Sequence, residues 1–152
     1  MSLQRLALIA LLLLLHSGCG PAELRDISDS APYRSQIGRS FETGTPITAA
    51  LVSLERDFSR ASTAVLLYPV PGPAGPEVLS EEIVPIGREV SVVGVYDVET
   101  MFGLFRDYLF RVDVEGCAVC VNVATYVYVK PSNSGSTILE PDGLLQFNES
   151  SE

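Results

Sequence analysis

The chain has 152 residues, of which 47% are hydrophobic, and its 19 acidic and 10 basic side chains give a formal net charge of −9. The length is enough for one domain with a hydrophobic core. A negatively charged surface repels phosphate groups, so we expect no nucleic-acid partner.

Residues 1–18 have the pattern of a secretory signal peptide. Arg5 provides the positive start, residues 6–15 form an unbroken apolar run, and the small residues Ser17 and Gly18 follow. An apolar run of this length is too short to cross a bilayer core, which needs about 20 residues in a helix. We therefore predict a targeting segment that is removed on export.

The sequence Ser17-Gly18-Cys19 resembles the lipobox of bacterial lipoproteins, with His16 where that motif usually has leucine. The resemblance implies that Cys19 carries a diacylglycerol and becomes the first residue of the mature protein. Gly20 after the cysteine, where the family's retention signal has aspartate, implies an outer-membrane lipoprotein that faces the periplasm. Several acyl chains anchor a protein firmly, at about 0.8 kcal/mol per buried methylene. An ordinary secretory signal is the alternative.

Removal of residues 1–18 would also take away Arg5 and the only histidine, His16. The mature chain would keep nine basic and 19 acidic residues, a side-chain charge of −10. A chain without histidine cannot use a Ser-His-Asp or Cys-His mechanism or imidazole-based zinc sites. No spacing singles out a carboxylate pair for catalysis. We therefore expect a non-enzymatic protein without cofactor or metal.

Residues 19–44 are polar and aperiodic, and we predict that they form the lipidated N-terminus and a flexible tether. From residue 45 onward, short β-branched runs separated by turn residues indicate a single all-β domain over residues 45–148. Residues 149–152 are predicted to be a frayed tail. The expected strands cover residues 45–54, 63–70, 78–86, 88–98, 107–114, 117–130, 137–139 and 144–147.

The clearest local unit is a predicted β-hairpin over residues 108–123. Apolar side chains alternate along residues 108–114, Glu115-Gly116 can form a two-residue turn, and the alternation resumes at Cys117. Such a pattern is typical of an antiparallel pair with one buried face.

The motif Val84-Pro85-Ile86-Gly87 precedes a valine-rich strand in which Val90 and Val92 are expected on one face and Val93 and Val95 on the other. Together with the irregular loop before it, this segment resembles SH3-like small barrels. The resemblance covers residues 69–96 and implies a small antiparallel barrel, with other small barrels or a sandwich as alternatives.

The sequence Cys117-Ala118-Val119-Cys120 admits three interpretations. A redox motif needs a helix N-terminus to lower the thiol pKa, but strand-forming residues follow. A metal knuckle needs two further ligands that the mature chain does not supply. A structural disulfide is favoured because lipidation of Cys19 would leave an even pair of exported cysteines. Residues i and i+3 of a regular strand point to opposite faces, so this disulfide would require a turn or bulge in place of the simple hairpin.

Two further segments have both a structural and a functional interpretation. Residues 69–76 contain four prolines and two glycines, and we favour a semi-rigid loop over a polyproline ligand. Met101, Phe102 and Phe105 belong to an apolar connection. These side chains either close the end of the core, which we favour, or contact a partner.

Together these features predict a lipid-anchored envelope protein whose acidic β-domain binds another protein or scaffolds an assembly. The predicted partners are the membrane, through Cys19, and an envelope protein. The alternative is a small-ligand or cell-wall-binding barrel, because tyrosine combines stacking with hydrogen bonding. A groove lined by Tyr96, Tyr108, Tyr126 and Tyr128 would support that alternative.

Overall fold

The computed structural model describes residues 23–55, 60–100, 105–131, 139–141 and 147–149. In these residues the protein is all-β, as predicted, and the one helical element is the 3-10 turn η1 (Arg34–Gln36). No helix in the described ranges is long and apolar enough to span a membrane.

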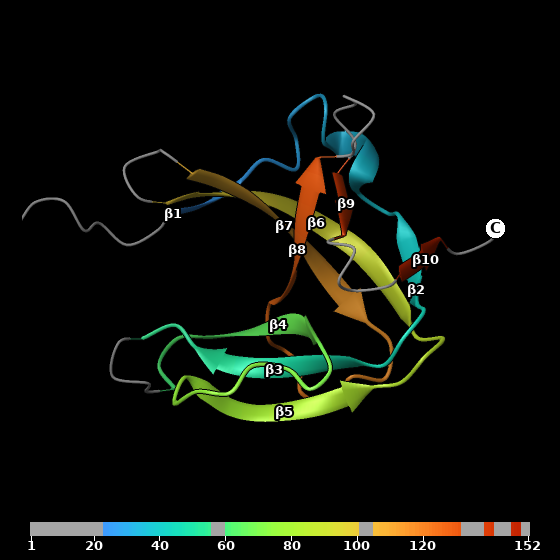
Figure 1. Cartoon of the computed structure of the whole chain (residues 1–152). Coiled ribbons are helices and arrows are strands. Elements are labelled where there is room, and N and C mark those ends of the chain that lie inside the picture. The colour runs from blue at the N-terminus through green and yellow to red at the C-terminus, as the bar shows by residue number, and fades with distance from the viewer. Residues whose placement is uncertain (1–22, 56–59, 101–104, 132–138, 142–146, 150–152) are drawn as a thin grey trace, which may run out of the picture.

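Ten strands make one mixed sheet, shown in Figure 1. The order along the sheet is β10-β2-β6-β7-β8-β4-β3-β5, with β1 also paired to β6 and β9 to β8. The strands are β1 (Glu23–Asp26), β2 (Ser40–Thr43), β3 (Ile47–Ser53), β4 (Thr63–Pro69), β5 (Val78–Val84), β6 (Glu89–Thr100), β7 (Phe105–Val114), β8 (Thr125–Pro131), β9 (Leu139–Pro141) and β10 (Phe147–Glu149).

The sheet is not closed into a barrel, so the SH3-like barrel expected from residues 69–96 is not formed. All pairs are antiparallel except β4 and β8, which are parallel. The sheet folds over between β8 and β4, so that β3, β4 and β5 lie across from β6, β7 and β8 (Figure 1). One core fills the space between the two halves.

Alternating apolar residues build this core from both halves of the sheet. Ile47 on β3, Val65 on β4 and Phe110 on β7 are fully buried, and Val127 on β8 is 1% exposed. Burying an aliphatic or phenylalanine side chain contributes about 1.5–3 kcal/mol. We infer that packing between the halves, rather than closure of the hydrogen-bond ladder, holds them together.

The predicted alternation of β6 is wrong, because a β-bulge interrupts that strand. The register with β7 shifts between Val92 and Gly94, and Val93 is 42% exposed. A bulge inserts one residue and changes which side chains face the core. Val95 is consequently buried together with Val90 and Val92, instead of lying opposite them.

The prediction of a tether over residues 19–44 is wrong from residue 23 onward. Strands β1 and β2 both pair with β6, and Ile27 and Phe41 are buried in the core. These apolar residues stand singly among polar ones, and each strand has four residues. No periodic pattern therefore marks them in the sequence.

The predicted two-residue turn at Glu115-Gly116 is also wrong, because β8 begins only at Thr125. The core face of β7 is confirmed, since Phe110 lies opposite Val127 and Val112 opposite Thr125. Residues 115–124 form a loop that contains the cysteine pair. The closing strands lie later than predicted, at β9 and β10, and Glu149 belongs to β10 rather than to a frayed tail.

Residues 70–77 form the predicted proline-rich loop between β4 and β5, and this loop passes over Thr48 on β3. Gly72 has φ +86°, and a Cβ atom on it would lie 2.7 Å from the Thr48 Cγ2 atom. Thr48 is fully buried, and its Oγ1 atom has no hydrogen-bond partner among the residues that the structure describes.

We expect Thr48→Val to raise the free energy of unfolding by about 1 kcal/mol, because an unpaired buried hydroxyl is costly. Urea unfolding followed by circular dichroism measures the change. Thr43→Val is the matched control. The Thr43 Oγ1 atom donates to the Pro85 carbonyl (2.7 Å) and accepts from the Arg88 N–H (3.0 Å), so its loss is destabilising. Equal effects of the two substitutions would contradict the prediction.

Candidate binding face

The sheet surface that points away from the core carries most of the chain's tyrosines. The β6–β7–β8 register aligns Gly94, Arg111 and Tyr126 in one row and Tyr96, Leu109 and Tyr128 in the next. The register of β4 with β8 places Leu66 beside Tyr126. Because side chains alternate along a strand, Tyr68 lies on the same side. We call the set Tyr68, Tyr96, Arg111, Tyr126 and Tyr128 the tyrosine face; it holds four of the six tyrosines.

The tyrosine face is packed although it faces outward. The rings of Tyr96 and Tyr126 lie edge to face, with centroids 5.7 Å apart. The Tyr96 ring also lies against Gly94, where a Cβ atom would come within 2.9 Å of Cε2. Leu109, in the row between Tyr96 and Tyr128, is only 7% exposed, whereas Tyr128 is 44% exposed. Packed rings therefore cover the apolar side chain of Leu109, whereas Tyr128 projects into solvent.

The environment favours the neutral form of Tyr68 and Tyr126 and the charged form of Arg111. Burial is the main cause that raises the pKa of Tyr126, and nearby Tyr96 adds to it. Burial likewise raises the pKa of Tyr68, followed by the effects of Tyr128 and Glu77. Hydrogen bonding to Tyr96 raises the pKa of Arg111 above its already high value. The tyrosine face thus combines tyrosine hydroxyls with the cation of Arg111, and the raised pKa of Tyr68 and Tyr126 favours their neutral form.

Asp26 on β1 lies opposite Tyr96 and anchors the N-terminal strand beside the tyrosine face. The Ser28 N–H donates to Asp26 Oδ1 (2.9 Å), and the Val95 N–H donates to Ser28 Oγ (2.9 Å). The Ser28 side chain, then its backbone N–H, and more weakly Tyr96 and Arg111, lower the pKa of Asp26. Asp26 therefore favours the folded chain in its charged form.

The low pKa of Asp26 makes stability depend on pH. Its folded pKa lies below the ordinary value of 3.8, so its contribution is present above that value and is lost as pH falls through the folded pKa. We expect Asp26→Asn to be less stable than the wild type at pH 7, with the difference vanishing at strongly acidic pH. Urea unfolding between pH 2 and 7 measures it. A stability difference between the two proteins that did not change with pH would contradict the lowered pKa of Asp26.

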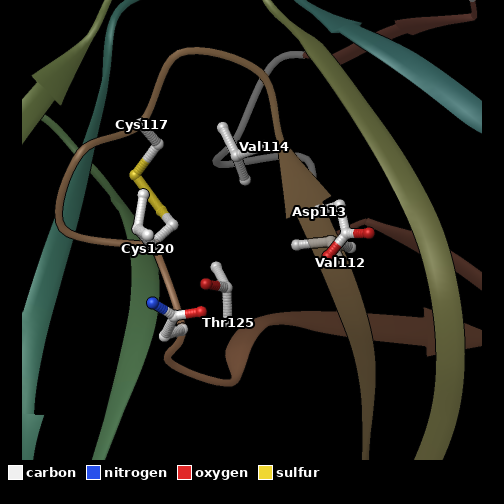
Figure 2. Close-up of a pocket in the computed structure, with 8 residues that line it drawn as sticks. Val112, Asp113, Val114, Cys117, Cys120 and Thr125 are labelled. Atoms are coloured by element: carbon white, nitrogen blue, oxygen red, sulfur yellow. A yellow bond between two sulfur atoms is a disulfide. The ribbon is translucent and has the colours of Figure 1, made fainter.

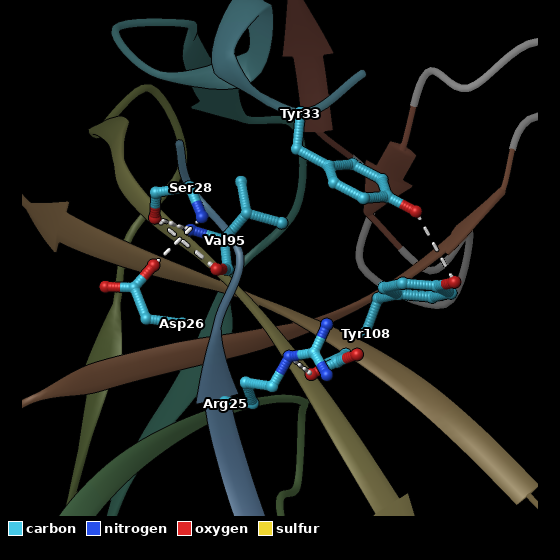
Figure 3. Close-up of polar contacts among 7 residues, drawn as sticks. Arg25, Asp26, Ser28, Tyr33, Val95 and Tyr108 are labelled. Atoms are coloured by element: carbon cyan, nitrogen blue, oxygen red, sulfur yellow. Dashed lines mark hydrogen bonds and ion pairs between the residues drawn. The ribbon is translucent and has the colours of Figure 1, made fainter. Parts of the chain in front are cut away.

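Tyr108 does not join the tyrosine face, so the groove of four tyrosines that would have supported a small-ligand or cell-wall-binding barrel is not formed. Tyr108 packs against the core side of the sheet, where its ring lies 5.8 Å from that of Tyr33 and the two hydroxyls are 3.5 Å apart (Figure 3). In the same region Arg25 Nε lies 3.8 Å from Asp97 Oδ1. Tyr68 was not among the tyrosines singled out from the sequence, although its alternation with the buried Leu67 indicates an outward side chain.

Cys117 and Cys120 are joined by a disulfide, with Cα atoms 5.3 Å apart, in the loop between β7 and β8 (Figure 2). The favoured interpretation of the cysteine motif therefore holds, and the turn that it required replaces the simple hairpin. The Glu82 carboxylate on β5 accepts hydrogen bonds from the Ala118 N–H (2.8 Å) and the Val119 N–H (3.1 Å). These bonds tie the loop to the last strand of the other half of the sheet.

A hollow of about 240 Å³ lies beside the disulfide (Figure 2). It is smaller than the usual 300–1,000 Å³ of ligand pockets. Asp113 is the only carboxylate among its lining residues, so the hollow offers no carboxylate pair for acid–base chemistry. Within the described part of the chain, no three cysteine, histidine, aspartate or glutamate residues gather as metal ligands would.

The remaining predicted site residues are not located by the structure. Cys19, Met101 and Phe102 lie outside the described residues. Phe105 is the first residue of β7, and only its backbone is described.

Comparisons with family models, with curated proteins and with solved structures find no significant match to this chain. The function is therefore inferred from the geometry of its own residues.

Proposed function

We propose that this chain is a lipid-anchored cell-envelope protein whose β-domain binds another protein through the tyrosine face and catalyses no reaction. The observation that carries the proposal is the gathering of four tyrosines and Arg111 on the outer side of β4 and β6–β8. Tyrosine and arginine are enriched among the residues that dominate binding energy at protein interfaces. Rings that are already packed lose little conformational freedom on binding.

The arrangement favours a protein partner over a small ligand. Small-molecule sites are concave and enclose most of the ligand. The tyrosine face instead consists of adjacent rows on neighbouring strands, and the hollow beside the disulfide is lined by none of its residues. Strands β7 and β8 are paired on both sides, so a partner would contact side chains here rather than extend the sheet.

Site-specific photocrosslinking in the intact, membrane-bound protein tests the proposal. We expect benzoylphenylalanine at Tyr128 to form an adduct with a single envelope protein. The same group at Val121, which is 64% exposed in the disulfide loop, is expected to form none. Tyr128→Ala should lower recovery of that partner, whereas the matched truncation Val121→Ala should not. Equal crosslinking at both positions would refute the proposal, and recovery of glycan alone would favour a cell-wall-binding domain.

The proposed lipid anchor has a separate test. Cys19→Ser is expected to abolish incorporation of labelled fatty acid and to move the protein from the membrane fraction to the soluble fraction. A variant that stayed fully membrane-bound would show that Cys19 is not the anchor. This result would leave the binding role of the tyrosine face open to its own test.

A further inference from the structure

Strand β5 is the last of the described strands along the sheet, and one of its backbone edges has no described strand beside it. Among the described residues it pairs with β3 alone, over Ile47–Val84 to Val52–Val78. Figure 1 shows β5 at the outer border of the lower half, with no described strand beyond it. An uncovered edge presents N–H and C=O groups that can pair with another extended chain.

The side chains of β5 differ in their surroundings on the two sides of the strand. Glu82 faces the core side and is bound to the disulfide loop through Ala118 and Val119. Glu81 and Ile83 lie two residues apart, so they share the opposite side of the strand. Glu81 is exposed and Ile83 is 51% exposed. The edge therefore offers a carboxylate and an apolar side chain on one side of a free backbone.

The negative charge around β5 determines which kind of segment could bind at this edge. Residues 61–87 contain no lysine or arginine, whereas Glu77, Glu81 and Glu82 all lie on or beside the strand. Pairing with a second copy of this chain would bring like charges together, which destabilises cross-strand pairs. An extended segment with basic side chains meets no such repulsion.

We propose that β5 accepts an extended, cationic segment of a partner protein as an additional strand. A lysine or arginine of that segment lies opposite Glu81, and an apolar residue two positions away lies opposite Ile83. Backbone hydrogen bonds hold the segment, and these two side chains select it. This surface is separate from the tyrosine face and adds a second contact to the binding role proposed above.

The probe is the peptide acetyl-Thr-Lys-Thr-Val-Thr-Lys-Thr-amide, added to the full chain. We expect it to slow hydrogen exchange of edge N–H groups within residues 78–84 by about tenfold. The matched control is the same peptide with alternate backbone nitrogens methylated on the pairing edge. This control keeps the charges but cannot donate the ladder hydrogen bonds, so we expect no protection.

Charge reversal supplies the specificity test. The Glu81→Lys substitution should weaken binding of the lysine peptide by about tenfold. The same variant should bind a version of the peptide with glutamate in place of lysine. Tyr128→Ala should leave both effects unchanged. No protection of β5, equal protection by the methylated peptide, or protection from self-association without peptide would each overturn the proposal.

Discussion

Phe110→Ala is expected to lower the free energy of unfolding by about 3–5 kcal/mol. Among the residues whose burial is described, Phe110 is the largest fully buried side chain, and on β7 it lies between Val95 of β6 and Val127 of β8. Its truncation would leave a cavity in the core between the two halves of the sheet. Chemical denaturation followed by circular dichroism measures the loss.

Two controls separate the cavity from a general effect of mutating the central strands. Phe110→Leu keeps most of the volume and is expected to cost clearly less than the alanine variant. Val93→Ala removes a side chain that is 42% exposed at the bulge of β6, and surface changes of this kind usually stay within about 0.5 kcal/mol. Comparable losses in all three variants would contradict the central position of Phe110 in the core.

The open sheet explains why one core residue should matter this much. In a closed barrel, hydrogen bonds run around the whole circumference and every strand has two neighbours. Here β5 has no such second partner among the described strands, and only β4 and β8 connect the two halves through the ladder. Side-chain packing between the halves must therefore provide the stability that a closed hydrogen-bond ladder would otherwise give.

The sequence predicts the all-β class and the middle strands because their patterns are local. Alternation along residues 108–112 identifies the buried face of β7, and turn residues separate β3, β4 and β5 at nearly the predicted bounds. The parallel pairing of β4 with β8 joins segments about sixty residues apart, and no local pattern reports such a partner.

The tyrosine face could be predicted only in part for the same reason. Tyr126 and Tyr128 alternate within one strand, so their common side is readable from the sequence. Tyr96 reaches that side because the bulge after Val92 changes the phase of β6, and Tyr68 reaches it through the parallel β4–β8 pair. The alternation of residues 108–114 places Tyr108 on the core face of β7 with Phe110 and Val112, which the structure confirms, so Tyr108 cannot share the outer face with the other tyrosines.

The disulfide is the other feature whose loss should be clearly measurable. We expect the double variant Cys117→Ala/Cys120→Ser to lose about 2 kcal/mol of stability, the chain-entropy value for the short loop closed by cysteines three residues apart. The loss should exceed that of a surface substitution because the bridge orders the loop that Glu82 binds. Urea unfolding under non-reducing conditions measures it.

A reducing agent provides the matched comparison without any substitution. It should destabilise the wild type by about the same 2 kcal/mol and leave the double variant unchanged. Peptide mapping of the oxidised protein should locate the bridge between residues 117 and 120, which separates it from any effect at Cys19. If Glu82 alone held the loop, reduction would leave stability unaltered while Glu82→Ala lowered it. That pattern would assign the stabilising role to the Glu82 carboxylate, which binds the loop, rather than to the disulfide.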